Sequence, residues 1–121
     1  MPSPRRIASS ALGLACALSA LGPASGEAKD LAARGRELLV LYRCGTCHAI
    51  PGVPGAHGQV AEPLTAWRHR SYIAGRLPNR PEVLARWIVA PQSLVPGTLM
   101  PRLGVTPAEA QAMAAYLYSL E

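Results

Sequence analysis

The feature that most constrains the fold is a pair of cysteines followed by a histidine. Segment 43–50 reads RCGTCHAI, so Cys44 and Cys47 are three residues apart and His48 comes directly after them. On a helical turn, residues three and four apart share a face, so all three side chains can bind the same group. The other cysteine, Cys16, lies far upstream in an apolar stretch. The fold must therefore be built around whatever these three side chains hold.

Four kinds of site use a Cys-x-x-Cys pair, and the surrounding sequence separates them. A thioredoxin-like redox pair is expected near a βαβ pattern, which this chain does not show. A structural zinc site needs four ligands, and only His57 and His69 are available to complete one. A disulfide is feasible after export, but it gives His48 no role. Cys-x-x-Cys-His is typical of haem c attachment, with thioethers from Cys44 and Cys47 and His48 as an axial ligand of the iron.

The first 26 residues predict a secretory signal peptide. A basic start is followed by an apolar run from Ala11 to Leu21 and then by the small residues Ala24 and Gly26. The apolar run is too short for an ordinary membrane span, which needs about 20 residues. We therefore expect residues 1–26 to be removed on export, leaving residues 27–121 as one periplasmic domain without a membrane span. An uncleaved anchor is the alternative.

Composition argues against nucleic acid as a partner and favours a core supported by a cofactor. Without Arg5 and Arg6, the chain has ten basic and seven acidic residues, and the arginines are scattered along it. A dense basic run of the kind that binds nucleic acid is missing from this pattern. A domain of about 95 residues without phenylalanine buries little surface, and such domains are often stabilised by a bound group.

Helical periodicity predicts an all-α domain with three main helices joined by long, proline-rich loops. The helices are expected over residues 31–42, over residues 81–90 and from Pro107 to the C-terminal end, with a short helical turn at 64–68. No segment shows the period-two alternation of a strand.

Capping residues predict where these helices begin. Thr106 is expected to cap the last helix together with Glu109, three residues on. Asp30 is the candidate N-cap of the first helix, and Asn79 and Glu82 are spaced like a capping box for the second.

The loop VPGTLMPRLG, residues 95–104, offers Met100 as the second axial ligand of the iron. Met100 follows a Pro-Gly turn and has no helical neighbours, whereas Met113 falls on the apolar stripe of the last helix and is expected to pack there. A thioether favours ferrous iron, so His/Met ligation raises the reduction potential. His57 and His69 are the rival ligands.

The order of these features resembles the class I cytochromes c, which are soluble monohaem proteins. The resemblance covers residues 30–120 and includes a Pro-Leu pair, an aromatic-bearing helix, a Pro-Gly-Thr-x-Met-Pro loop and a last helix with Tyr116-Leu117. It implies a small cytochrome c fold over residues 27–121, with loops wrapped around one covalent haem c and its iron. It also implies that the first and last helices cross near Gly35 and Tyr116. The segments IPGVPGAHGQV, YIAGRLPN and PGTLMPRLGVT further resemble bacterial cytochrome c domains associated with haem-copper oxidases.

The same resemblance implies roles around the haem. The carbonyl of Pro63 is expected to accept a hydrogen bond from the free ring nitrogen of His48, which fixes the ring. Trp87 is expected to lie against the haem, and Tyr72 and Thr98 to donate to its propionates. Plain core packing for Trp87 and ordinary loop positions for Tyr72 and Thr98 are the alternatives.

Together these features predict an electron-transfer protein rather than an enzyme. The iron would alternate between Fe(II) and Fe(III), and we expect a monomer that meets respiratory redox partners such as a haem-copper oxidase or a periplasmic dehydrogenase. One alternative is a haem enzyme or a small-ligand sensor with a labile sixth ligand. The other is a permanently docked cytochrome subunit of an oxidase or dehydrogenase complex.

Overall fold

The structure, a computed structural model, describes residues 1–3 and 24–121. The apolar run from Ala11 to Leu21, with Cys16 inside it, lies outside the described residues. The cleavage point expected after residue 26 falls within the first helix and stays a prediction. Among the described residues, no helix is both long and apolar enough to cross a membrane.

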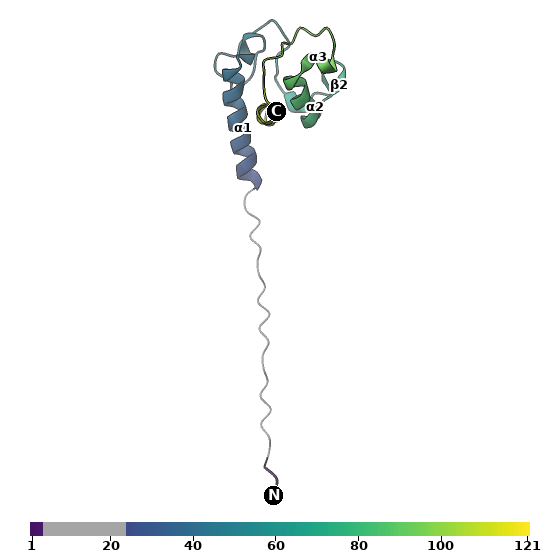
Figure 1. Cartoon of the computed structure of the whole chain (residues 1–121). Coiled ribbons are helices and arrows are strands. Elements are labelled where there is room, and N and C mark those ends of the chain that lie inside the picture. The colour runs from purple at the N-terminus through teal and green to yellow at the C-terminus, as the bar shows by residue number, and fades with distance from the viewer. Residues whose placement is uncertain (4–23) are drawn as a thin grey trace.

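The domain is mostly helical, and the expected three main helices are confirmed. A single-turn helix, two 3₁₀ turns and a two-stranded ribbon complete it. In chain order the elements are α1 (Ala24–Leu41), η1 (Cys44–Thr46), η2 (Trp67–His69), β1 (Tyr72–Ile73), β2 (Leu77–Pro78), α2 (Pro81–Val89), α3 (Pro91–Leu94) and α4 (Pro107–Tyr118). Figure 1 shows α1 at one side of the molecule, with α2 and α3 at the other.

The ribbon is the one departure from the expected absence of strands. β1 and β2 pair antiparallel, with Tyr72 opposite Pro78 and Ile73 opposite Leu77. The turn between them has positive φ angles at Ala74 (50°) and Gly75 (65°). Strands of two residues are too short to show alternation, which explains why the sequence pattern missed them.

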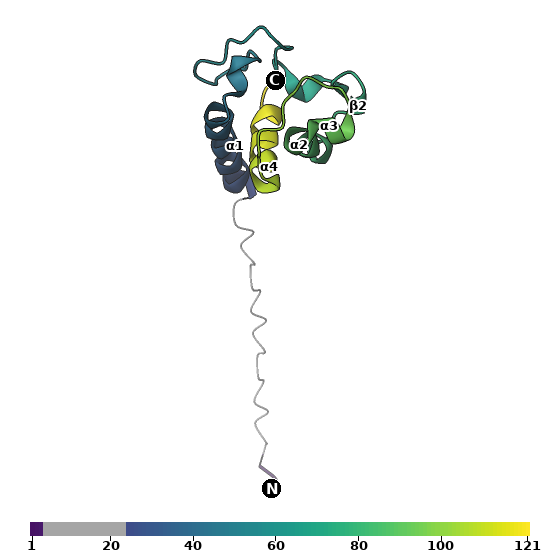
Figure 2. The same cartoon turned by 45° about the horizontal axis from the view of Figure 1, so that its top comes forward.

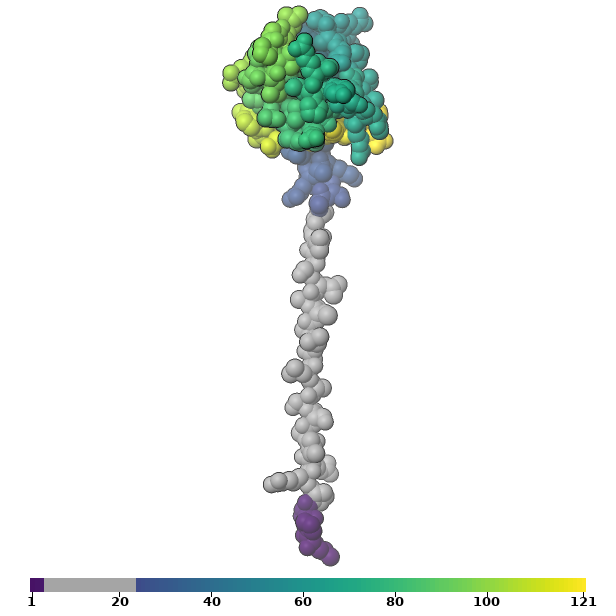
Figure 3. Space-filling view, turned by 90° about the vertical axis from the view of Figure 1, so that its right-hand side faces the viewer, coloured from purple at the N-terminus to yellow at the C-terminus, as the bar shows by residue number. Residues whose placement is uncertain are grey.

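α1 begins at Ala24, upstream of the expected start at residue 31. The added segment contains alanine, glutamate and lysine, which favour helix. Asp30 therefore lies inside α1, and its prediction as the N-cap is wrong. Figure 3 shows the first turns of α1 projecting from the rounded body of the domain. The residues that α1 buries are Gly35, Leu38 and Leu39.

α1 and α4 lie side by side and form the most extensive contact between helices, as Figure 2 shows. A Cβ atom on Gly35 would lie 1.9 Å from the carbonyl oxygen of Ala112, so the absence of a side chain allows this close approach. The expected crossing at Gly35 is confirmed, but its partner is Ala112 rather than Tyr116. One turn further along α4, the Tyr116 hydroxyl donates to the Pro51 carbonyl at 2.6 Å.

The start of α4 is confirmed in full. Thr106 Oγ1 accepts a hydrogen bond from the Glu109 N–H at 3.3 Å, and Glu109 Oε2 accepts from the Thr106 N–H at 2.9 Å. This reciprocal pair is a capping box, and Pro107 occupies the first helical position.

The capping box expected for α2 is wrong. Arg80 is the N-cap of α2 and makes no side-chain cap. The Asn79 amide instead donates to the carbonyls of Trp67 (3.0 Å) and Arg70 (2.9 Å), and its Oδ1 accepts from the Tyr118 hydroxyl at 2.5 Å. Asn79 therefore ties the turn before β1 to the end of α4.

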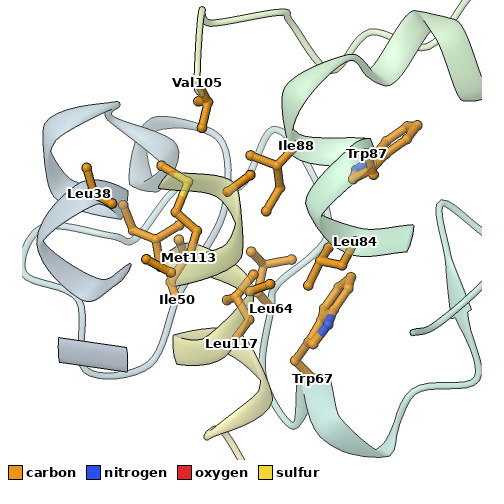
Figure 4. Close-up of a cluster of buried hydrophobic side chains, with 14 of the residues drawn as sticks. Leu38, Ile50, Leu64, Trp67, Leu84, Trp87, Ile88, Val105, Met113 and Leu117 are labelled. Carbon is orange, nitrogen blue, oxygen red and sulfur yellow. The ribbon is translucent and has the colours of Figure 1, made fainter. Parts of the chain in front are cut away.

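The core lies where α4 packs between α1 and α2. Met113 of α4 is 0% exposed, so its predicted packing role is confirmed. In Figure 4, Ile88 points toward the α4 side of α2, whereas Trp87 points away from Met113. The labelled members of the cluster are Leu38, Ile50, Leu64, Trp67, Leu84, Trp87, Ile88, Val105, Met113 and Leu117.

Candidate functional site

The two cysteines and the histidine occupy a single tight turn directly after α1. Arg43 ends the helix with a left-handed backbone (φ 57°), and η1 follows. The carbonyl of Cys44 accepts hydrogen bonds from the N–H groups of Cys47 (3.3 Å) and His48 (3.1 Å). Both thiols are free and partly buried. The local backbone thus brings the three predicted cofactor residues together.

The ring of His48 is fixed by a backbone carbonyl. His48 Nδ1 lies 2.6 Å from the carbonyl oxygen of Glu62, and because a carbonyl can only accept, Nδ1 is the donor. The Nε2 atom is then the nitrogen left to bind a metal. The expected acceptor was Pro63, so the structure shifts this bond by one residue. The Pro63 carbonyl accepts from Arg70 Nη2 instead.

Arg70 holds the segment that carries this carbonyl. Its Nη1 donates to Glu62 Oε2 at 3.1 Å, and its Nε and Nη2 donate to the Thr65 carbonyl at 3.3 and 3.1 Å. Its guanidinium carbon also lies 5.3 Å from the centroid of the Trp67 ring. One side chain therefore fixes residues 62–65, a role that the sequence pattern did not reveal.

The loop after His48 wraps around the cysteine turn. Four backbone hydrogen bonds join residues 56–64 of this loop to residues 45–50, and two of them reach the cysteine turn itself. A Cβ atom on Gly58 would lie 2.5 Å from the Thr46 carbonyl oxygen. His57 is exposed and forms a β-bridge with Ala49, the residue after His48. The backbone of His57 therefore lies next to the segment that carries His48. The four bonds are Ile50 N to Ala56 O, Gly58 N to Gly45 O, Ala61 N to Cys47 O and Leu64 N to Ala49 O.

The surroundings of Cys44 do not favour a thiolate, the form that cysteines take in redox pairs and zinc sites. Burial raises the pKa of the Cys44 thiol to about 11, so the thiol stays protonated at neutral pH. Reactive and metal-binding cysteines are thiolates, which electropositive surroundings favour. In the part of the chain that the structure describes, no three His, Cys, Asp or Glu side chains are grouped so that they could hold a metal ion.

Met100 lies on the loop between α3 and α4 with its side chain partly buried against the core. Its neighbour Leu99 is 98% exposed, so the two side chains point in different directions. The Met100 N–H donates to Thr98 Oγ1 at 3.3 Å, and its carbonyl accepts from Gln92 Nε2 at 2.7 Å. Gln92 is a contact that sequence reasoning missed, because nothing local to the Met100 loop points to it.

The remaining predicted residues differ in their surroundings. Trp87 is buried on α2, and Thr98 is half-buried with its hydroxyl hydrogen free to donate. Tyr72 is 60% exposed on β1. His69 is exposed at the end of η2, as expected for a surface residue. The roles of Trp87, Tyr72 and Thr98 toward a haem stay predictions.

The donor set fits a haem c. Two free thiols stand one turn apart for thioether bonds, and the imidazole next to them has Nε2 free for iron. Met100, from a separate loop, supplies a soft thioether of the kind that haem iron accepts.

The family to which the sequence is similar agrees with a haem c site. Residues 32–121 match the sequence model of the family described as Cytochrome c. The chain is 38% identical over 94 residues to cytochrome c oxidase subunit 2 of Alkalihalophilus pseudofirmus, a match that covers 77% of this chain and 27% of that protein. No solved structure gives a significant match. Members of the matched family are typically electron carriers with covalent haem c, and since the match covers most of the chain, this protein belongs to the cytochrome c family.

Proposed function

We propose that the protein is an exported electron carrier that moves single electrons between respiratory redox partners through one haem c. The observation that carries the proposal is the arrangement of His48, whose Nδ1 donates to the Glu62 carbonyl at 2.6 Å and leaves Nε2 for iron. A ligand histidine oriented in this way is typical of metal and haem sites. The signal pattern of residues 1–26 supports export to the periplasm.

When bound, the haem supplies an iron that alternates between Fe(II) and Fe(III). Cys44 and Cys47 would hold it covalently, and His48 and Met100 would be the ligands of its iron. The Glu62 carbonyl fixes the imidazole and raises its basicity. The Met100 thioether favours Fe(II) and so raises the reduction potential. Because both ligands stay in place, little rearranges when an electron enters or leaves.

An absorption spectrum tests the ligation. The protein is exported in a host with haem-attachment machinery and measured in the ferric state in the far red, where a methionine-sulfur-to-iron band appears. We expect the wild type to show the band. Met100→Ala should lose it, bind imidazole or carbon monoxide, and have a lower reduction potential. A variant with unchanged band and potential would assign the sixth ligand to another residue.

A second candidate function is that of a bound component of an oxidase complex. The 38% identity to cytochrome c oxidase subunit 2 favours it, although the chain spans only 27% of that protein's length. Both candidates use the same haem chemistry and differ in the lifetime of the partner contact. Fractionation of cells that express the tagged full chain separates them. If the protein is recovered from the periplasmic fraction without a partner, the diffusing carrier is supported. If oxidase subunits co-purify with it from solubilised membranes, the bound component is supported.

A further inference from the structure

The backbone of Met100 is fixed from both sides by side chains. Its N–H donates to Thr98 Oγ1 at 3.3 Å, and its carbonyl accepts from Gln92 Nε2 at 2.7 Å. Within residues 24–121, these are the only hydrogen bonds that residues 99–105 make. Pro101 follows directly and has no N–H to add another. The loop that carries Met100 therefore depends on very few polar contacts.

Of the two contacts, the one from Gln92 joins the loop to a fixed part of the fold. Gln92 follows Pro91, which is fully buried and begins α3, and the turn closes with a hydrogen bond from Val95 N to the Pro91 carbonyl at 2.9 Å. Its amide is therefore a donor that belongs to a helical turn with a buried first residue. Thr98, by contrast, belongs to the loop itself, so its contact with Met100 does not join the loop to another element.

We propose that Gln92 is a positioning residue for Met100 as the sixth ligand, an inference that rests on the proposed His/Met ligation. With the Met100 carbonyl anchored to α3, the thioether is held where the iron needs it, and the loop opens less often. Without the donor, opening costs less free energy, so an external ligand competes more successfully for the iron.

The test compares haem-loaded wild type with Gln92→Leu, Gln92→Glu and the control Gln111→Leu. Leucine cannot donate, and a glutamate carboxylate of nearly the same shape can only accept at neutral pH. Gln111 is an exposed glutamine on α4, so its variant makes the same chemical change away from the loop. Imidazole affinity, the far-red band and the reduction potential are measured, with circular dichroism to confirm the fold.

Both Gln92 variants should bind imidazole about three- to tenfold more tightly than wild type, the range expected for loss of one hydrogen bond. Their far-red band should weaken and their reduction potential fall, while Gln111→Leu matches wild type. Gln92 variants with wild-type imidazole affinity and band would overturn the inference while leaving the proposed function intact. A wild type without the band would contradict the His/Met ligation itself, and the inference with it.

Discussion

At the scale of single residues, the orientation of the His48 ring depends on a backbone carbonyl. The Glu62 carbonyl accepts from His48 Nδ1, while the Glu62 side chain turns to Arg70. The position of that carbonyl is set by the path of residues 62–65, which Arg70 holds through two further carbonyls. The side chain of Arg70 is therefore more important for the site than the side chain of Glu62.

We predict that Arg70→Ala lowers the free energy of unfolding by about 2 kcal/mol, because it removes hydrogen bonds to the Pro63 and Thr65 carbonyls as well as one ion pair. Glu62→Gln is the matched control. It removes only a partly exposed ion pair and should cost less than about 1 kcal/mol. Urea unfolding of the two haem-loaded variants measures both values. Equal losses would mean that the ion pair, not the carbonyl contacts, fixes the segment.

The close grouping of the candidate haem residues Cys44, Cys47 and His48 was predictable from the sequence, but the contacts that support them were not. Cys44, Cys47 and His48 are defined by spacing alone, since one turn brings them together whatever surrounds it. The acceptor for His48 depends on how a loop fourteen residues away folds against it, and Arg70 fixes that loop through contacts that no local pattern specifies. The same holds for Gln92, which donates to the carbonyl of Met100, eight residues further along the chain.

At the scale of elements, the crossing of α1 and α4 depends on one glycine. Helix propensity alone predicts that Gly35→Ala stabilises the protein by about 1 kcal/mol. The new Cβ would lie 1.9 Å from the Ala112 carbonyl oxygen, so the helices must separate. We therefore predict a net loss of about 1 to 3 kcal/mol in the free energy of unfolding, as for other overpacked sites. Denaturant unfolding gives the sign of the change in the free energy of unfolding. A variant more stable than the wild type would show that the helix crossing can accommodate a methyl group.

The cap of α4 is also joined to the segment that follows α1. The Tyr42 hydroxyl donates to Glu109 Oε2 at 2.9 Å, the same oxygen that caps the helix. The hydrogen bond from the Thr106 N–H, followed by that from Tyr42, lowers the pKa of Glu109. A carboxyl whose pKa is lower in the folded state stabilises the fold above its unfolded pKa, and this contribution is lost as the pH falls through the folded pKa.

We predict that thermal stability of the wild type falls more steeply below about pH 4.3, the ordinary pKa of glutamate, than that of Glu109→Gln. The glutamine keeps an acceptor for the Tyr42 hydroxyl but does not titrate. Melting temperatures of both haem-loaded proteins between neutral and acidic pH test this, with Glu37→Gln as an exposed control on α1. Parallel curves for wild type and Glu109→Gln would exclude a role for this carboxylate in acid stability.

Element boundaries were predictable where the deciding contacts are local. The start of α4 follows from Thr106 and Glu109, which bond to each other. The start of α2 was assigned to Asn79, but that side chain bonds to Trp67, Arg70 and Tyr118. An asparagine before a helix has the same appearance in sequence whether it caps the helix or bridges distant segments, so only the tertiary structure separates the two.

At the scale of the whole molecule, the predicted haem residues come from separate segments of the chain. The cysteine turn follows α1, the histidine acceptor lies in the loop before η2, and Met100 lies between α3 and α4. Long loops with few hydrogen bonds, such as residues 99–105, gain order from what they bind. We therefore expect a bound haem to contribute to the stability of the fold as well as to its chemistry.

The double variant Cys44→Ser with Cys47→Ser removes both thioether bonds. We predict that acidic organic solvent then extracts the haem, and that the melting temperature of the variant is lower by more than about 10 °C. A loss of about 3 kcal/mol suffices, since each kcal/mol shifts the melting temperature of a domain of this size by about 4 to 8 °C. Thr46→Ala changes an exposed residue between the two cysteines and serves as the control. An unchanged melting temperature with extractable haem would show that the helices and loops reach full stability without covalent attachment. Haem that resists extraction would show that it is bound through other residues.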